Sequence, residues 1–294
     1  MGKAISLIGH PIRNSLTPAI QRAALESCGI DAMFELWDTP EKDVESRIQQ
    51  LRTGDCLGAQ VSTPYRVWFN AWADVKDASA QNVGACNVVV CKEGQLIAHN
   101  TDVAGFRQAL ATTNINVNGK RVLLLGAGGV ARAALAALRP CNITQTTVWN
   151  HDFEELGRLK QHQDTLGFTD IGYVCCTEDY RSPGQKLLLA TLAREADLVI
   201  QATTIGMSSG LDHGQSLLDS QMINQRSVVF DAVANPIVTP LLRQALKAGA
   251  AVIRGLDMLL FACAAAFTLW TGQEAPFRVM EQAAYAEFER QNPK

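Results

Sequence analysis

Residues 121–152 have the sequence RVLLLGAGGVARAALAALRPCNITQTTVWNHD, and they carry the strongest indication of architecture in the chain. The apolar run over residues 122–125 predicts a buried strand, and the turn GAGGVA follows it directly. The alanine-rich segment after this turn predicts a helix, and the β-branched run over residues 143–149 predicts a second strand. Glycines placed between a strand and a helix indicate a dinucleotide site far more strongly than the same glycines alone.

The small residues of this turn each have a mechanical purpose. Gly126 permits the tight turn, Gly128 lets the backbone approach a pyrophosphate, and Ala131 allows the helix to pack on the strand. Helix N-terminal amides and the helix dipole both favour bound phosphate. We therefore expect a dinucleotide to bind along Gly126, Ala127, Gly128, Gly129 and Val130. The alternative is a tight strand–helix turn that holds no ligand.

The residues after the second strand indicate which dinucleotide binds. Asp152 follows Gly128 at close to the roughly 20-residue interval at which an acidic residue meets the ribose 2′-hydroxyl. A carboxylate accepts hydrogen bonds from the ribose diol and repels a 2′-phosphate. Asn150 also lies at this turn, and no arginine stands there, the nearest being Arg158. The turn therefore favours NAD over NADP. Asp152 also suits the N-cap of a helix that begins at Phe153, and the two roles are compatible.

Composition excludes several function classes. The chain has 294 residues, a net charge of −3 and 19% charged residues, so neither nucleic acid nor a membrane surface is an expected partner. Its eight cysteines form no CxxC pair and its five histidines show no metal-ligand spacing, so we expect reduced thiols and no metal. No signal peptide is apparent, which favours a cytoplasmic protein. The apolar run over residues 258–270 is short for a membrane span and predicts a buried helix.

Strand and helix patterns alternate along the rest of the chain and predict an α/β fold with two domains. Residues 1–103 form the first domain, with a predicted hairpin turn at Glu93-Gly94. Residues 104–255 form a Rossmann-like domain, with further strands over residues 173–176, 198–201 and 228–231. Helices within residues 256–294 return to complete the first domain.

Two polar clusters follow predicted strands of the first domain. Ser15 and Thr17 are two residues apart in a loop, so both hydroxyls can face one anion. The second cluster is Asn100-Thr101-Asp102, which leads into the next helix. Helix capping is an alternative role for each cluster.

These motifs together resemble the shikimate/quinate dehydrogenases nearly from end to end. The matching segments are GHPIRNSLTP, QVSTPYR, GACNV, HNTDVAGF, GAGGVA, QATTIGM, FDAVANPIVTPLL and GLDML…AFTLWTG. The resemblance implies an oxidoreductase of aromatic amino acid biosynthesis with a substrate domain and a Rossmann domain. It implies hydride transfer between NAD or NADP and C3 of a cyclic hydroxy acid.

The resemblance also assigns roles by position. Ser15 and Thr17 would hold the substrate carboxylate, Asn87 and Asp102 would hold ring hydroxyls, and Ser62 would contact substrate. The coenzyme would be bordered by Thr203, Ile205, Gly206, Met207, Val233, Gly255 and Met258, in addition to the glycine turn, Asn150 and Asp152.

Several residues depart from the family pattern. Arg66 stands where the family has a catalytic lysine, and an arginine side chain stays protonated and cannot act as a general base. Arg66 can still pair with Asp102 and stabilise an alkoxide, which makes Asp102 the expected acid/base. Ala234 and Ala262 replace a substrate-binding tyrosine and glutamine, and Gln60 replaces an asparagine. These changes predict an altered choice of substrate.

The sequence therefore predicts an NAD-preferring dehydrogenase, monomeric or homodimeric, that acts on a quinate- or shikimate-like acid. The Ser-x-Thr pair resembles members that accept quinate. A low-activity shikimate dehydrogenase paralogue is one alternative. A non-catalytic, NAD-dependent sensor is the other.

Overall fold

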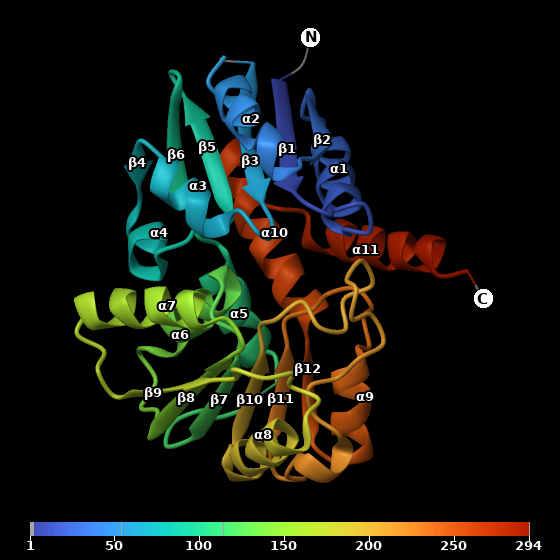
Figure 1. Ribbon diagram of the computed structural model, residues 1–294. Helices are drawn as coiled ribbons and strands as arrows, with labels where there is room; N and C mark the ends of the chain where they lie inside the picture. The colour runs from blue at the N-terminus through green and yellow to red at the C-terminus, as the bar shows by residue number, and fades with distance from the viewer. Residues whose placement is uncertain (1–2, 54, 114, 294) are drawn as a thin grey trace. The chain divides into compact units, whose positions relative to one another are not determined.

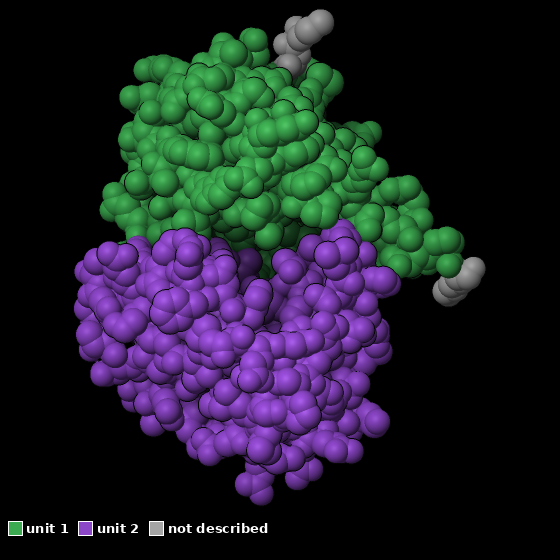
Figure 2. Space-filling view, in the orientation of Figure 1, with its two compact units in different colours: residues 1–108, 258–294 green, residues 109–257 purple. Residues whose placement is uncertain are grey.

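A computed structural model describes residues 3–53, 55–113 and 115–293. The chain forms two compact units, coloured separately in Figure 2: unit 1 comprises residues 1–108 and 258–294, and unit 2 comprises residues 109–257. The chain passes between the units inside two helices, α5 (Asp102–Ala111) and α10 (Gly255–Thr271). Each boundary therefore lies a few residues beyond the strand-to-helix junction that the sequence suggests.

Unit 1 is built on a six-stranded mixed sheet with the order β2-β1-β3-β5-β6-β4 (Figure 1). Its strands are β1 (Lys3–Gly9), β2 (Ala32–Asp38), β3 (Cys56–Val61), β4 (Val75–Lys76), β5 (Val88–Lys92) and β6 (Gln95–His99). β1 pairs in parallel with β2 and β3, whereas β5 runs antiparallel to both β3 and β6. The predicted hairpin is confirmed, since Glu93 and Gly94 both have positive φ values, 52° and 76°.

Helices cover this sheet and return from the end of the chain. They are α1 (Thr17–Ser27), α2 (Val44–Leu51), α3 (Arg66–Trp72), α4 (Ala78–Val83), α10 and α11 (Phe277–Gln291). The return of the C-terminal helices is confirmed: α11 packs against α1, and Trp270 of α10 donates a 3.0 Å hydrogen bond to the Val89 carbonyl of β5. This bond fixes α10 across the sheet that carries the polar clusters.

Unit 2 is a parallel, doubly wound sheet with the order β12-β11-β10-β7-β8-β9. Its strands are β7 (Arg121–Leu125), β8 (Gln145–Asn150), β9 (Ile171–Cys175), β10 (Leu198–Gln201), β11 (Val228–Asp231) and β12 (Ala251–Arg254). Numbered from β7, this is the order 3-2-1-4-5-6 of the dinucleotide-binding fold. The predicted α/β fold with a Rossmann-like domain is confirmed.

The helices of unit 2 are α6 (Gly129–Leu138), α7 (Phe153–Thr165), α8 (Pro183–Glu195) and α9 (Pro240–Lys247). β7 is buried apart from its first residue, and α6 is buried from Ala131 to Leu138. The alanine-rich sequence explains this burial, because small side chains let a helix lie close to the strand before it. The βαβ segment is therefore a rigid base for the glycine turn.

The apolar run over residues 258–270 lies within α10, as the sequence predicts. Among the described residues, no helix combines the length and the apolar character that a bilayer span requires. α3, β4, α4 and β12 have no counterpart in the sequence prediction. α3, β4 and α4 have at most seven residues each and show no clear periodic pattern, whereas β12 is a short apolar run that the sequence analysis did not assign.

Candidate active site

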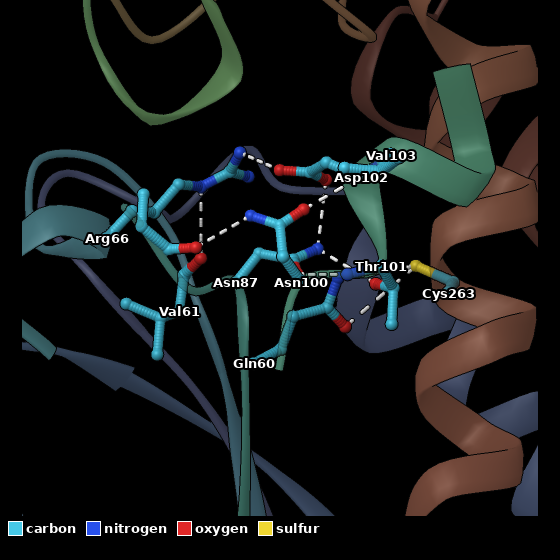
Figure 3. Close-up of polar contacts among 10 residues, drawn as sticks. Gln60, Val61, Arg66, Asn87, Asn100, Thr101, Asp102, Val103 and Cys263 are labelled. Carbon is cyan, nitrogen blue, oxygen red and sulfur yellow. Dashed lines mark hydrogen bonds and ion pairs between the residues drawn. The ribbon is translucent and has the colours of Figure 1, made fainter. Parts of the chain in front are cut away.

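A buried ion pair between Arg66 and Asp102 lies among the polar residues of unit 1, next to Asn87 (Figure 3). Arg66 is the first residue of α3, and Asp102 is the first residue of α5. Their side chains are 16% and 6% exposed, and Nη1 of Arg66 donates to the Asp102 carboxylate. Nε of Arg66 donates a 3.2 Å bond to the Val61 carbonyl, which fixes the guanidinium against the end of β3. The expected pairing of these two residues is confirmed.

Asn87 holds the other side of the Asp102 carboxylate. Its side-chain nitrogen donates 2.9 Å bonds to Oδ1 of Asp102 and to Oγ1 of Thr101. Its side-chain oxygen accepts a 2.7 Å bond from the Thr101 backbone amide. Since Asn87 is completely buried, this amide is a fixed template for the orientation of Asp102.

Asn100, rather than Asp102, provides the cap of α5. The side-chain oxygen of Asn100 accepts a 3.3 Å bond from the Val103 amide, and its nitrogen donates to the Ala85 carbonyl. Ser79 supports this segment, because its hydroxyl accepts a 2.7 Å bond from the Asn100 amide. The Asp102 carboxylate is therefore left to contact Arg66 and Asn87.

The surroundings of Asp102 affect its proton affinity in opposite directions. Burial raises the pKa of Asp102 above its ordinary value, while the Arg66 charge and the Asn87 hydrogen bond oppose this rise. The net shift is upward. A carboxyl group with a raised pKa can exchange a proton closer to neutral pH, as general acid–base chemistry requires.

A second cluster joins α1 and β3 to α10 through glutamine side chains. Gln60 donates to the Cys263 thiol at 3.6 Å, and Gln21 donates to the Gln60 side chain at 3.4 Å and to the Cys263 carbonyl at 3.1 Å. The Thr17 hydroxyl also bonds to this thiol. Burial raises the pKa of Cys263 to about 12, so the thiol acts as a neutral hydrogen-bonding group. The sequence analysis noted Gln60 but not Gln21 or Cys263.

Ser15 and Thr17 lie at the start of α1, where Leu16 occupies the N-cap position without a side-chain cap bond. The hydroxyl of Ser15 accepts a 3.3 Å bond from the Thr17 amide. Thr17 is 3% exposed and Ser15 is partly exposed. Ser62 directly follows β3, and its amide donates to the Ile8 carbonyl at 2.7 Å.

Ala262 is 1% exposed and is packed against Gly105, where a Cβ would lie 3.1 Å from the Ala262 Cβ. The space beside this alanine is therefore filled by the α5 backbone. Ala234, in unit 2, is partly exposed in the segment after β11.

The expected coenzyme residues of unit 2 all follow the carboxyl ends of strands in one parallel sheet. Gly126 to Val130 follow β7, Asn150 ends β8 and Asp152 comes after it, and the remaining residues follow β10, β11 and β12. In doubly wound sheets this edge is where ligands bind. Met258 is different, because it belongs to unit 1 and is buried in α10.

The glycine turn has no room for a side chain at Gly126, and its bare backbone is open to a ligand that approaches closely. Gly126 has φ +113°, and a Cβ there would lie 2.9 Å from the Ala202 carbonyl oxygen. Gly128 is the N-cap of α6, so its position offers no side-chain acceptor to the first amides of the helix. The amides and dipole of this end can bind phosphate, which fits a dinucleotide.

A short loop after β10 is held by its own polar side chains. The Thr203 hydroxyl donates to the Gln201 side chain at 3.1 Å and accepts from the Ile205 amide at 3.3 Å. Gly206 has φ +86° and Met207 follows it. Val233 lies against Gly255, where a Cβ would be 2.4 Å from the Val233 carbonyl oxygen.

The capping role of Asp152 is confirmed, since its carboxylate accepts from the Glu155 amide at 2.9 Å.

A doubly wound unit with this turn, in one chain with an α/β unit carrying a buried Asp–Arg–Asn cluster, defines a nicotinamide-dependent oxidoreductase. The family model for the shikimate dehydrogenase substrate binding domain matches residues 7–89, and that for the shikimate 5′-dehydrogenase C-terminal domain matches residues 263–285. The NADP(+) shikimate dehydrogenase of Symbiobacterium thermophilum is 33% identical over 99% of this chain and 96% of its own length. The chain belongs to the shikimate dehydrogenase family.

Solved structures of relatives agree with this assignment. Shikimate 5-dehydrogenase from Thermus thermophilus, in complex with NADP(H) and shikimate, has a TM-score of 0.79 and 32% identity, covering 97% of this chain and 99% of its own. Shikimate 5-dehydrogenase from Listeria monocytogenes, in complex with shikimate and NAD, has a TM-score of 0.78 and 26% identity, covering 96% of each chain. Structures of similar fold thus contain either nicotinamide coenzyme.

Proposed function

We propose that this chain catalyses reversible hydride transfer between NAD and the C3 hydroxyl of a quinate- or shikimate-like cyclic hydroxy acid. The observation that carries the proposal is the buried Asp102 carboxylate, held by Arg66 on one side and Asn87 on the other. Unit 1 is the proposed substrate domain, and unit 2 is the proposed coenzyme domain.

In this proposal Asp102 is the acid/base. During oxidation it accepts the hydroxyl proton at a carboxylate oxygen, and during reduction it returns this proton. Arg66 donates hydrogen bonds to the oxygen that becomes an alkoxide, and its positive charge stabilises the negative charge that develops there. Such preorganised charge is a large source of rate enhancement. Asn87 orients the carboxylate through its 2.9 Å bond. The nicotinamide, when bound, accepts or returns the hydride.

The proposed substrate contacts follow the polar clusters of unit 1. Ser15 and Thr17 bind the carboxylate, Asn87 and Asp102 bind ring hydroxyls, and Ser62 completes the set. A site built to bind hydroxyls strongly rejects ligands whose polar groups it cannot pair. In this proposal, the choice among cyclic acids is made by Gln60 and Cys263, which lie beside Thr17. The Thr17 hydroxyl favours quinate, whose extra C1 hydroxyl it would meet.

The proposed preference for NAD rests on charge. Asp152 follows β8, where the adenosine ribose of a dinucleotide lies in this fold class, and a carboxylate there repels a 2′-phosphate. This differs from the NADP(+) named for the Symbiobacterium relative. The test is a panel of quinate, shikimate and their amino analogues with NAD and NADP. Absence of turnover with all of them would refute the dehydrogenase proposal.

A non-catalytic, NAD-dependent binding protein is the second candidate, and Arg66 in place of the family's lysine favours it. Arg66→Lys separates the two. Turnover that persists or rises in the lysine variant supports a dehydrogenase, whereas NAD binding without turnover in both proteins supports a binding protein. Loss of hydroxy-acid binding in the variant indicates that Arg66 anchors a different substrate.

A further inference from the structure

A second acidic side chain lies closer to the glycine turn than Asp152 does. A Cβ built on Gly128 would be 3.3 Å from Oε1 of Glu155, so this carboxylate lies against the backbone of the turn. Glu155 is in the first turn of α7 and is only partly exposed. The sequence analysis did not identify it, because its place beside Gly128 depends on the packing of α7 against the turn.

Asn150 fixes the Glu155 carboxylate. Its side-chain nitrogen donates a 3.0 Å bond to Oε2 of Glu155 and a 3.2 Å bond to the Asp152 carbonyl. Asn150 is 2% exposed, so the donor itself is held in place. Oε1, the oxygen near Gly128, is therefore presented to whatever lies on the turn.

A buried cation in α6 interacts electrostatically with Glu155. Arg132 is 4% exposed in α6, and its amide donates to the Gly128 carbonyl at 3.0 Å. Burial lowers the pKa of Arg132, and the negative charge of Glu155 opposes this shift. The Glu155 carboxylate is thus a counter-charge that partly offsets the burial of Arg132.

Asp152 is less suited to the same task. It is exposed, and its Oδ1 is already engaged as the cap of α7. An exposed carboxylate is screened by water and salt, whereas a partly buried carboxylate on a fixed donor acts at short range.

We infer that Glu155 is the main coenzyme-specificity residue of this protein: its carboxylate accepts the ribose hydroxyls of NAD and excludes the 2′-phosphate of NADP. The inference rests on the proposed dinucleotide site, but not on which hydroxy acid is the substrate. Removing this charge does two things: it abolishes the repulsion, and it leaves the Arg132 charge uncompensated near the phosphate position. Neutral variants therefore gain affinity for NADP.

The experiment is titration calorimetry of the full chain with NAD and NADP, without substrate, for wild type, Glu155→Gln, Asp152→Asn and Glu154→Gln. Glu154 is the matched control, since it is an exposed glutamate one position earlier that pairs with Arg158. We expect Glu155→Gln to lower the NAD:NADP affinity ratio by about tenfold or more, Asp152→Asn by less, and Glu154→Gln by less than about twofold.

A ratio unchanged in Glu155→Gln, or changed more by Asp152→Asn, would overturn the inference. If Glu155→Gln does not fold because Arg132 loses its counter-charge, Glu155→Asp is measured instead. Its shorter side chain keeps the charge but withdraws it from Gly128, so NAD binding should weaken about fivefold or more, and unchanged NAD binding overturns the inference. Binding with the expected ratios but no turnover refutes only the dehydrogenase proposal, while no binding of either dinucleotide refutes both.

Discussion

The side-chain amide of Asn87 donates a 2.9 Å hydrogen bond to the Asp102 carboxylate while it holds Thr101 through both its nitrogen and its oxygen. A single buried amide thus fixes the carboxylate and the backbone that precedes it. The position of Asp102 relative to Arg66 depends on this arrangement.

We expect Asn87→Ala to lower kcat for hydroxy-acid oxidation by about ten- to a hundredfold, because the base loses its orientation. The Asn87 hydrogen bond opposes the upward shift of the Asp102 pKa, so its loss raises that pKa further. Oxidation requires ionised Asp102. The acidic limb of the kcat/KM profile against pH should therefore move to higher pH. An acidic limb that does not shift would show that Asn87 does not influence the titration of Asp102.

Arg66→Gln should reduce kcat/KM by about a hundredfold or more, which is the usual cost of removing one donor from a developing oxyanion. The variant also loses the positive charge that opposes the rise in the Asp102 pKa, so the acidic limb again moves upward. Arg66→Lys keeps the charge and is the matched control for the glutamine variant. Equal activity and equal pH profiles in the two variants would contradict an electrostatic role for Arg66.

Gly126→Ala should weaken NAD binding by about tenfold or more and lower the free energy of unfolding by about 1–3 kcal/mol. The reason is geometric: φ is +113° and a Cβ would lie 2.9 Å from the Ala202 carbonyl oxygen. Gly157→Ala is the control, since Gly157 is inside α7 with no neighbour within 4 Å of an added Cβ. That variant should gain about 0.5–1 kcal/mol, as glycine-to-alanine changes in helix interiors do. Calorimetry and denaturant unfolding measure both effects.

The sequence predicts the elements whose pattern is local. The strands over residues 198–201 and 228–231 have the same bounds in the structure, because each is a compact run of three apolar residues that ends at a polar one, Gln201 or Asp231. β12 is an apolar run of the same length between Gly249 and Gly255, so its pattern was recognisable although the sequence analysis did not predict it. α3 carries an aromatic-rich sequence with no helical periodicity and is not recognisable from local pattern.

The same limit applies to the candidate site. Arg66, Asn87 and Asp102 belong to motifs, and their proximity could be expected from family resemblance. Gln21 and Cys263 are 242 residues apart in the chain, and nothing in the sequence near either one indicates the other. Glu155 looks like an ordinary surface glutamate until the fold brings it to Gly128. Contacts made by tertiary packing alone are the part that sequence patterns cannot supply.

A buried carboxyl group away from the candidate acid/base makes a prediction about stability. Asp231, at the end of β11, is fully buried, accepts hydrogen bonds from the Thr239 hydroxyl and the Val233 amide, and has its pKa raised by burial from 3.8 to about 7. The folded chain therefore binds the Asp231 proton more tightly than the unfolded chain does. As pH rises from about 4 to about 7, this group lowers the free energy of unfolding, and its stabilising effect is lost above that window.

Asp231→Asn removes the titration while keeping groups that can bond Thr239 and Val233. We expect its free energy of unfolding to depend less on pH between about 4 and 7 than that of wild type. At pH 8 the variant should be the more stable protein by a few kcal/mol at most, since each pKa unit corresponds to about 1.4 kcal/mol. Asp219→Asn, a change at an exposed carboxylate in the same unit, is the control and should keep the wild-type slope. Denaturant unfolding at a series of pH values measures this dependence. Parallel curves for wild type and Asp231→Asn would show that folding does not raise the pKa of Asp231.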